Sequence, residues 1–453
     1  MSNQLLSQTA NRRVRVALFA IAFSLCLSQL THADNWSQWR GNKLDSVTME
    51  KSLPGKLSMD KNLLWKFEMP GTGGASPVVW NDHIFVMSVE GNGQENGKPL
   101  SLLCVTTQGK LKWKKPLEGR NKRSRDSGDS ASPSPFTDGT HVWAMTTNGV
   151  IQCFDFEGNQ VWAKDLQKEY GEFHIQFGMT STPVLDQGKI YLQLIHGKMK
   201  RGSKATSVGW VVALDAKNGN EIWKHQRKTD GMFENMHSYA SPSIYRDNQN
   251  EFLVTHGGDY VIGHSLESGD EIFRCGDMNP KGDGYNYFLR FVSSPLCVEG
   301  MLIVPTAKSG PVLALDPAKK LAGDVTEKKE TRHWRLDQGT PDVATPVVYD
   351  GMVYLARETG VLIALDSETG EMVYQKRMLA DRHRSTPVAG DGKVYFADRR
   401  GNLKIIEAGE EPNVLTNLSL GEETLASPAI SNGVLYIRTQ ENLYAFGTST
   451  SQE

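Results

Sequence analysis

Short apolar runs separated by turn residues recur along most of the chain. The stretch Ala344–Tyr374, ATPVVYDGMVYLARETGVLIALDSETGEMVY, shows the pattern in full. Two β-rich runs flank Asp350-Gly351, which is a hairpin signal. The ETG that follows predicts a second turn, VLIALD a third strand and EMVY a fourth. The stretch therefore predicts one sheet of four antiparallel strands.

The start of this unit occurs eight times. Each copy is a Ser-Pro or Thr-Pro followed by a short apolar run, and successive copies lie 41 to 59 residues apart. Proline cannot donate to a β-ladder, so it suits the start of an inner edge strand. Repeats of this period predict a propeller or a solenoid. The eight pairs are Ser76-Pro77, Ser132-Pro133, Thr182-Pro183, Ser241-Pro242, Ser294-Pro295, Thr345-Pro346, Thr386-Pro387 and Ser427-Pro428.

The end of the unit repeats as well. A glycine is followed four residues later by an aromatic residue, and an apolar run that ends in an acid precedes it. In the quoted unit, Asp366 can cap the turn and Gly370 can take a positive φ. We expect the aromatic side chains to pack between neighbouring blades. The glycine–aromatic pairs are Gly109/Trp113, Gly158/Trp162, Gly219/Trp223, Gly269/Phe273 and Gly370/Tyr374; before His333-Trp334 an insertion at about Pro317–Thr331 replaces the glycine.

The sequence thus predicts an all-β fold, an eight-bladed propeller of four-stranded antiparallel blades. A β-solenoid is the competing prediction, but it needs shorter and more uniform repeats. The run NLLWKFEMP, which carries Trp65, precedes the first repeat, and we expect it to supply the outer strand of the last blade and close the ring. The expected domains are a signal peptide at 1–33, an N-terminal strap on the outside at 34–61, the propeller at 62–447 and a tail at 448–453.

The N-terminus has the features of a secretory signal peptide. Arg12, Arg13 and Arg15 precede the mostly apolar run 16–30, and cleavage is expected after Ala33. The alternative, a membrane anchor, needs a longer apolar core. We therefore expect an exported protein, periplasmic or associated with the cell envelope, whose mature chain has no membrane span.

Composition excludes little. Apolar residues make up 39% of the chain and charged residues 23%, as in ordinary globular proteins. The formal net charge of −2 gives no general attraction to nucleic acid. Four cysteines remain after Ala33, with no CxxC or vicinal pair, and the sequence cannot assign disulfides. They are Cys104, Cys153, Cys275 and Cys297.

The signature ALDxxTGxxxW, clearest at 213–223 and 364–374, resembles the pyrroloquinoline-quinone-type propeller repeat. The resemblance covers about 65–447. It implies the fold more strongly than the function, because the motif builds blades. One branch of the family contains quinoprotein alcohol dehydrogenases, which typically carry a vicinal Cys-Cys, a Trp under the quinone and a calcium site of Glu, Asn and Asp. This chain has no Cys-Cys and no residue-by-residue match to those calcium ligands.

The other branch contains non-enzymatic propellers similar to BamB, which helps to assemble outer-membrane proteins. The size of the chain is closer to this BamB-like branch, although Leu25 before Cys26 disfavours the lipidation expected there. The hypothesis that follows is an exported, non-catalytic scaffold that binds envelope proteins without a cofactor. The alternatives are a quinoprotein dehydrogenase using pyrroloquinoline quinone with calcium, and a propeller that binds an acidic polysaccharide.

Candidate binding residues lie in the loops that should open on one face of the ring. These loops are more basic than the whole chain, so an anionic ligand or an acidic protein surface could be attracted there; ordinary solvated loops are the alternative. Arg290 and Arg384 rank first because they lie closest to inner strands. The predicted mouth residues are Arg290, Arg384, His237, Tyr239, Gln176, His174, Asp342, Lys308, Arg357 and Arg399.

Catalytic and metal-binding motifs are missing from the sequence. The histidines are scattered, without HxH or HExxH spacing, and no G-x-S-x-G, Walker or dinucleotide motif occurs. We therefore predict no catalytic residue and no metal ligand.

Overall fold

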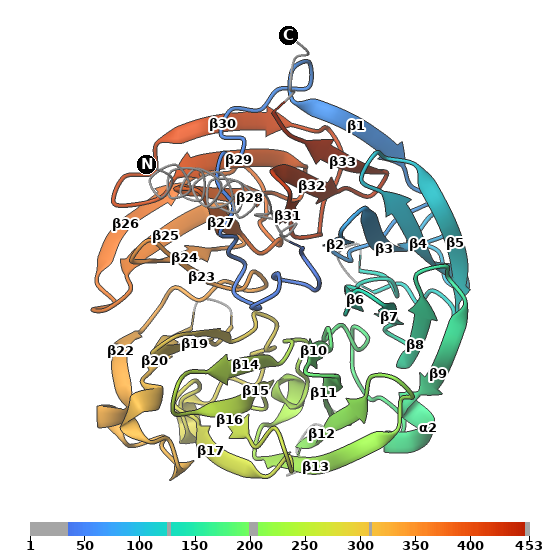
Figure 1. Cartoon of the computed structure of the whole chain (residues 1–453). Helices are drawn as coiled ribbons and strands as arrows, with labels where there is room; N and C mark the ends of the chain where they lie inside the picture. The colour runs from blue at the N-terminus through green and yellow to red at the C-terminus, as the bar shows by residue number, and fades with distance from the viewer. Residues whose placement is uncertain (1–34, 125–127, 199–206, 308–309, 449–453) are drawn as a thin grey trace, which may run out of the picture. The chain divides into compact units, whose positions relative to one another are not determined.

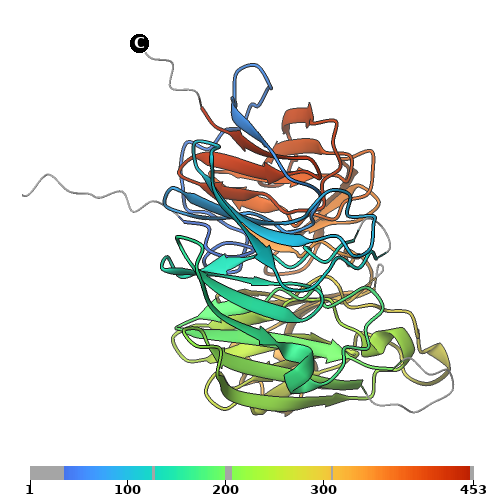
Figure 2. The same cartoon turned by 90° about the vertical axis from the view of Figure 1, so that its right-hand side faces the viewer.

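The computed structural model describes residues 35–124, 128–198, 207–307 and 310–448. Within these residues, eight antiparallel sheets stand around a central axis (Figure 1), and Figure 2 shows them edge-on. The predicted eight-bladed propeller is confirmed. The first four blades contain β2 Val78–Trp80, β3 His83–Val89, β4 Leu100–Thr106 and β5 Leu111–Leu117; β6 Phe136–Thr137, β7 His141–Met145, β8 Val150–Asp155 and β9 Gln160–Asp165; β10 Val184–Asp186, β11 Lys189–His196, β12 Ser207–Asp215 and β13 Glu221–Thr229; and β14 Ser243–Arg246, β15 Glu251–Gly257, β16 Tyr260–His264 and β17 Glu271–Cys275.

The last blade is completed by the N-terminal strand β1 Leu63–Glu68. This strand pairs with β33, with Lys66 opposite Tyr444, as the position of Trp65 predicted. The remaining strands are β18 Leu296–Val298, β19 Met301–Pro305, β20 Val312–Leu315 and β22 Arg332–Leu336; β23 Val347–Tyr349, β24 Met352–Ala356, β25 Val361–Asp366 and β26 Met372–Arg377; β27 Val388–Gly390, β28 Lys393–Ala397, β29 Asn402–Glu407 and β30 Val414–Ser419; and β31 Ala429–Ser431, β32 Val434–Arg438 and β33 Asn442–Phe446.

The turns of the quoted unit form as the sequence predicted. Asp350 and Gly351 have φ of 51° and 73°, the left-handed values that a tight hairpin needs. Asp366 Oδ1 accepts hydrogen bonds from the backbone N–H groups of Glu368 (3.1 Å) and Thr369 (2.8 Å). These bonds hold the turn between the third and fourth strands of the blade.

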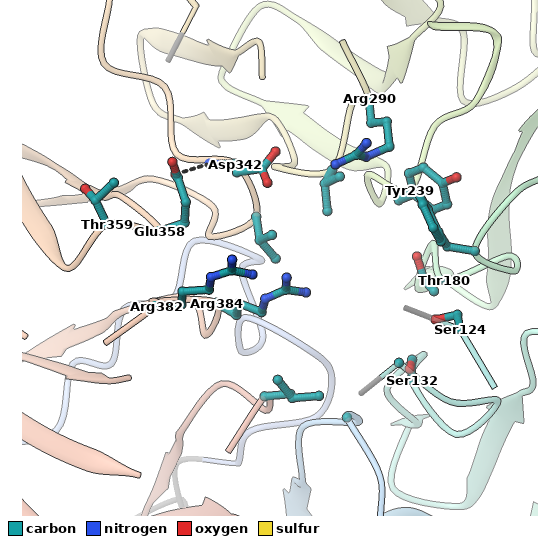
Figure 3. Close-up of a pocket in the computed structure, with 16 residues that line it drawn as sticks. Ser124, Ser132, Thr180, Tyr239, Arg290, Asp342, Glu358, Thr359, Arg382 and Arg384 are labelled. Atoms are coloured by element: carbon teal, nitrogen blue, oxygen red, sulfur yellow. Dashed lines mark hydrogen bonds between the residues drawn. The ribbon is translucent and has the colours of Figure 1, made fainter. Parts of the chain in front are cut away.

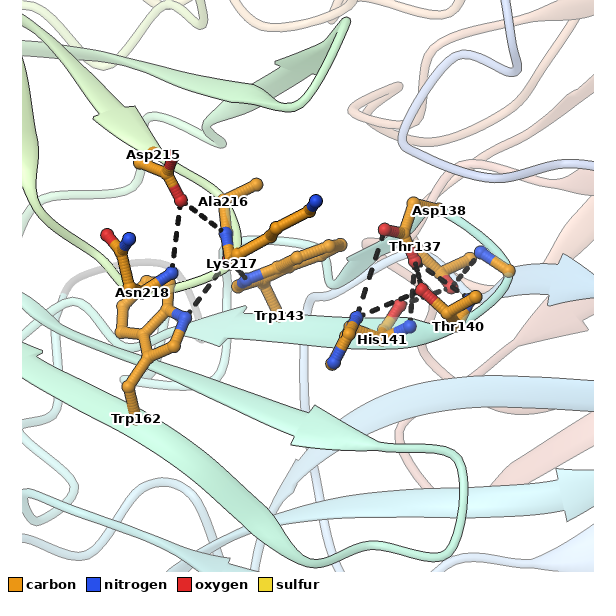
Figure 4. Close-up of polar contacts among 11 residues, drawn as sticks. Thr137, Asp138, Thr140, His141, Trp143, Trp162, Asp215, Ala216, Lys217 and Asn218 are labelled. Carbon is orange, nitrogen blue, oxygen red and sulfur yellow. Dashed lines mark hydrogen bonds and ion pairs between the residues drawn. The ribbon is translucent and has the colours of Figure 1, made fainter.

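Tryptophans join neighbouring blades. The indole N–H of Trp223 donates to the carbonyl of Leu266 in the next blade (3.2 Å), and its ring lies where a Cβ on Gly269 would stand. Figure 4 shows another case, in which Trp143 and Trp162 both donate to Ala216 O. The same contact recurs for Trp65, Trp113 and Trp334. The expectation that the aromatic residues pack between blades holds at these interfaces.

The boundary between the fourth and fifth blades is built differently. The fourth blade carries Phe273 instead of Trp, so it has no indole N–H to donate. Here the insertion forms β21 Gly323–Asp324, which pairs in parallel with β17 as a fifth strand. Arg332 and Arg335 then bond the carboxylate of Asp277, on the loop that follows β17.

A closed ring of hydrogen bonds surrounds the axis. In each blade, the backbone N–H of the Ser or Thr before the inner-strand proline donates to the hydroxyl oxygen of the matching residue in the next blade, at 2.8–3.3 Å. In the second blade this residue is Ser134, so the predicted Ser132-Pro133 is wrong by two residues. Both Ser-Pro pairs fit the motif, and only the pairing of Phe136 with Trp143 fixes the register. We call these residues the hydroxyl ring: Ser76, Ser134, Thr182, Ser241, Ser294, Thr345, Thr386 and Ser427.

The N-terminal segment 35–61 crosses the ring instead of running around its outside as expected (Figure 1). Trp39 Nε1 donates to the hydroxyl of Ser427 (3.2 Å). The buried guanidinium of Arg40 donates to the carbonyls of Pro295 (2.9 Å) and Pro242 (3.3 Å), which directly follow hydroxyl-ring residues. Its polar side chains thereby give hydrogen-bond partners to backbone groups near the axis.

Within the described ranges, helices are few and short. They are α2 Leu166–Tyr170 and the 3-10 turns η1 Phe233–Met236, η2 Gly282–Gly284, η3 Pro317–Lys319 and η4 Lys329–Thr331. Among the residues described, no helix has the length and apolar character to cross a membrane. The predicted signal peptide lies outside those residues.

All four cysteines after Ala33 are buried free thiols. Burial raises the pKa of Cys104 to about 12, so the thiol stays protonated and acts as a small apolar side chain.

Candidate functional site

A cavity of about 650 Å³ lies on the axis, on the opposite side of the hydroxyl ring from the N-terminal segment. Its lining follows a simple rule. In every blade, the residue two positions before the hydroxyl-ring residue lines the cavity. These eight residues are Gly74, Ser132, Thr180, Tyr239, Val292, Val343, Arg384 and Leu425.

One wall of the cavity is charged. Arg382 and Arg384 extend into it from a single loop, and Arg290 enters from the loop before Val292 (Figure 3). Asp342 and Glu358 line the same wall, where the backbone N–H of Asp342 donates to Glu358 Oε2 (3.2 Å). The structure therefore brings together Arg290, Arg384, Tyr239 and Asp342, four of the ten predicted residues.

Local structure explains why both arginines of the loop face the cavity. Between them, His383 is buried, and its backbone N–H donates to Glu358 O (3.2 Å). The backbone N–H of Arg399 donates to Arg382 O (2.7 Å). An extended chain turns alternate side chains to opposite sides, so burying His383 directs both neighbours toward the axis. Burial also lowers the pKa of His383 to about 3.

Arg290 is held by two contacts. Its Nη1 lies 3.0 Å from Glu234 Oε2, and its guanidinium lies 5.4 Å from the centre of the Phe177 ring. Phe177 also packs against Tyr239, with ring centres 5.7 Å apart. These contacts place a cation and an aromatic wall side by side. Phe177 was not among the predicted residues, because it lies five positions before Thr182 in a loop without repeat character.

Three predicted residues lie near the mouth but do not line this cavity. His237 is buried, and its Nε2 lies 2.9 Å from Gly197 O. Burial lowers the pKa of His237 and brings that of its neighbour His196 down to about 4. His174 is partly exposed beside Glu172, and Gln176 is exposed.

The other predicted residues also lie elsewhere. Arg399 forms an ion pair with Glu423 and lines a second cavity of about 660 Å³ together with Arg382 and Arg400. The Arg357 side chain is partly exposed, and its backbone N–H bonds Val361 O (2.8 Å). Lys308 lies outside the described residues.

Two exposed aromatic residues lie on the loop that leads to Arg290 of the charged wall. Tyr287 and Phe288 are 46% and 53% exposed, and within the described parts of the chain no other Phe, Tyr or Trp is exposed. The Phe288 ring meets Phe233 edge-on at 5.5 Å, and Tyr287 meets Tyr285 at 4.8 Å. We call Tyr287 and Phe288 the rim pair.

A buried polar network holds the loop that carries the rim pair. The carboxylate of Asp259 accepts hydrogen bonds from the Tyr285 hydroxyl and from Asn235 Nδ2 (2.9 Å). Asn235 and Asn279 also donate to the carbonyl of Asn286, at 2.9 and 3.0 Å. Burial raises the pKa of Asp259 to about 6. The network fixes the backbone directly before the rim pair, so the exposed aromatic residues stand on an ordered loop.

Comparison with known proteins assigns the family. Residues 56–318 and 325–453 match the family described as outer membrane protein assembly factor BamB. The chain belongs to this family. The BamB family match covers nearly the whole propeller, as the repeat signature predicted, while no curated protein sequence matches the chain significantly.

Solved structures share the fold at low sequence identity. BamB from Moraxella catarrhalis superposes with a TM-score of 0.58 at 12% identity, covering 86% of this chain and 98% of its own. Quinohemoprotein alcohol dehydrogenase from Comamonas testosteroni gives 0.64 at 12%, covering 93% and 82%. A europium-containing methanol dehydrogenase gives 0.66 at 12%, covering 91% and 98%. The fold is therefore common to assembly factors and to dehydrogenases.

The residues of the cavity do not fit a quinone held by a metal ion. Arginines could meet the carboxylates of such a cofactor, but a cation needs several oxygen ligands. The lining offers two carboxylates, Asp342 and Glu358, beside three guanidinium groups. No group of three or more His, Cys, Asp or Glu side chains suited to a metal ion occurs within the described ranges.

Proposed function

We propose that the protein is an exported, non-catalytic propeller that binds protein partners in the cell envelope through its mouth. The observation that carries the proposal is the rim pair, two exposed aromatic side chains on a loop fixed by buried hydrogen bonds. Aromatic residues and arginine dominate the binding energy of protein interfaces, and a rigid loop loses little entropy on binding. The match to the BamB family supports the same conclusion.

The test is a comparison of three forms of the chain from Asp34 onward, used as bait in envelope extracts. The first is wild type, and the second carries Tyr287→Ser and Phe288→Ser. The third carries Met372→Ser and Val373→Ser, a matched control on the outer wall, where these side chains are 48% and 38% exposed. We expect specific partners to be retained by wild type and the control but lost by the rim variant. Equal retention by all three would contradict the proposal.

A quinoprotein dehydrogenase is the second candidate, favoured by the shared fold and by the arginine wall. A thermal melt with pyrroloquinoline quinone and calcium separates it from the first. Ligand at 100 times its dissociation constant stabilises a protein by about 2.7 kcal/mol. A rise in melting temperature that requires both additives would favour the dehydrogenase, whereas a scaffold predicts no shift.

A further inference from the structure

The cavity has two unlike walls. The charged wall carries Arg290, Arg382 and Arg384, whereas the opposite wall is small and neutral, with Gly74, Ser132 and Thr180. Guanidinium groups gathered on one side of a cavity favour a ligand whose negative charge is at one end. The neutral wall leaves room for backbone or small side chains.

The arginines are held before any ligand arrives. Backbone hydrogen bonds on both sides of the 382–384 loop fix its course, and Arg290 is held between Glu234 and Phe177. Ligand binding therefore needs little ordering of the loop backbone or of the Arg290 side chain, which preserves affinity. Asp342 and Glu358 on the same wall repel anions, so a bound anion must be held by direct, paired hydrogen bonds to the guanidinium groups.

The N-terminal segment spans the channel on the far side of the hydroxyl ring. Trp39 bonds Ser427 of the last blade, and Arg40 bonds the carbonyls of Pro242 and Pro295 in the fourth and fifth blades. A polypeptide that enters from the mouth meets this segment, so a chain end or a side chain reaches the arginines most directly.

The rim pair precedes Arg290 by two to three residues, and Phe288 packs on Phe233, which is next to Glu234, the partner of Arg290. A chain that leaves the cavity beside Arg290 can therefore contact the rim pair.

We propose that this cavity binds the free C-terminal carboxylate of a partner polypeptide, with the preceding residues packed against the rim pair. The proposal rests on the proposed function and names the part of the partner that is recognised. The carboxylate of a chain end supplies two oxygens to the arginine wall, and capture of a C-terminal carboxylate is a recurring mode of peptide recognition.

The test uses immobilised octapeptides with four randomised C-terminal positions, prepared once as free acids and once as C-terminal amides. Wild type should bind the free-acid library and lose at least about tenfold in affinity on the amides, as expected for loss of a charge-assisted pair. Arg384→Gln should show the same loss on the free acids. Arg400→Gln is the matched control, because Arg400 is exposed on the same face, pairs with Asp381 and does not line the cavity.

Several outcomes would overturn the proposal. These are equal binding of the two libraries, no binding of the free acids, or unchanged binding by Arg384→Gln. Arg382→Gln serves as a second variant if Arg384→Gln fails to fold by circular dichroism. Arginine-dependent binding of an oligogalacturonate in place of the peptides would show a sugar acid as the ligand. The rim variant separates the two proposals: if it loses envelope partners while the libraries bind equally, the proposed function stands and the carboxylate site does not.

Discussion

Two positions only two residues apart in each blade differ sharply in the variety of their side chains. At the hydroxyl ring, every blade has Ser or Thr, and each one makes the same contact with its neighbour. Two residues earlier, the eight blades have Gly, Ser, Thr, Tyr, Val, Val, Arg and Leu. Positions that repeat within the chain build the ring, whereas positions that differ from blade to blade give the cavity its unequal walls.

The same contrast separates the two ends of the channel. Below the ring, the N-terminal segment pairs its polar groups with backbone carbonyls and with Ser427. Above it, the arginines and the rim pair face the mouth. We therefore expect changes at repeated positions to lower the free energy of unfolding, and changes at the unrepeated positions to alter binding instead.

The largest effect on stability is expected at a tryptophan between blades. Trp223→Ala removes a buried ring that packs on Gly269 and a hydrogen bond to Leu266 O. Loss of a buried Trp typically costs about 3–5 kcal/mol. Chemical denaturation measures the change, with Trp223→Phe as the control, since Phe stands at the matching position in the next blade. A cost below about 1 kcal/mol for the alanine variant would contradict the role given to this contact.

A smaller loss is expected within the hydroxyl ring. Ser294→Ala leaves the buried N–H of Ser241 without its acceptor (2.9 Å), which should cost about 1–3 kcal/mol. Ser294→Thr keeps the hydroxyl and should cost less, because three of the eight ring residues are Thr. Equal costs for both variants in denaturation experiments would mean that the ring of hydrogen bonds does not stabilise the fold.

Acid should weaken the loop beneath the arginines. The pKa of His383 is about 3 in the folded protein and about 6.5 when unfolded, so this residue lowers the free energy of unfolding as pH falls from 6.5 toward 3. At pH 5.5 the loss is about 1.4 kcal/mol. His383→Leu cannot lose stability in this way. The free energy of unfolding of wild type should therefore fall by about 1.4 kcal/mol relative to that of the variant between pH 7.5 and 5.5. The same difference in free energy of unfolding at both pH values would contradict the burial of an uncharged His383.

The smallest effect on stability is expected at the cavity wall. Arg384→Gln should change the free energy of unfolding by less than about 0.5 kcal/mol, the usual range for positions outside the core. A loss of more than about 2 kcal/mol would mean that Arg384 stabilises the fold as the hydroxyl-ring residues do. The proposed contrast between the hydroxyl ring and the position two residues before it would then be wrong.

The blades could be predicted because their signals are local and repeated. A Ser/Thr-Pro pair, a hairpin turn and a Gly-x-x-x-Trp recur within about fifty residues, so each copy supports the others. The ambiguity at Ser132 and Ser134 arose where the local signal occurred twice. The course of the N-terminal segment could not be predicted, because Arg40 contacts Pro295, 255 residues away, through a pattern that occurs once.

The cavity was partly predictable for the same reason. Spacing from the repeat identified Arg290, Arg384 and Tyr239, and the two-residue rule would have given Thr180 and Leu425 as well. His237 has the same spacing from its repeat as Arg290, but it follows the 3-10 turn η1 and is buried against Gly197. Phe177 and the rim pair depend on loop conformations set by tertiary contacts, which no repeat encodes.

The most direct test of the mouth as the binding face is photo-crosslinking in the producing cell. A photoreactive phenylalanine analogue would replace Phe288 at the rim in one strain and Val373 on the outer wall in another, both exposed in the folded chain. We predict a discrete crosslinked polypeptide at position 288 that is missing at position 373. Identical crosslinks at both positions, or none at position 288, would contradict partner binding through the mouth.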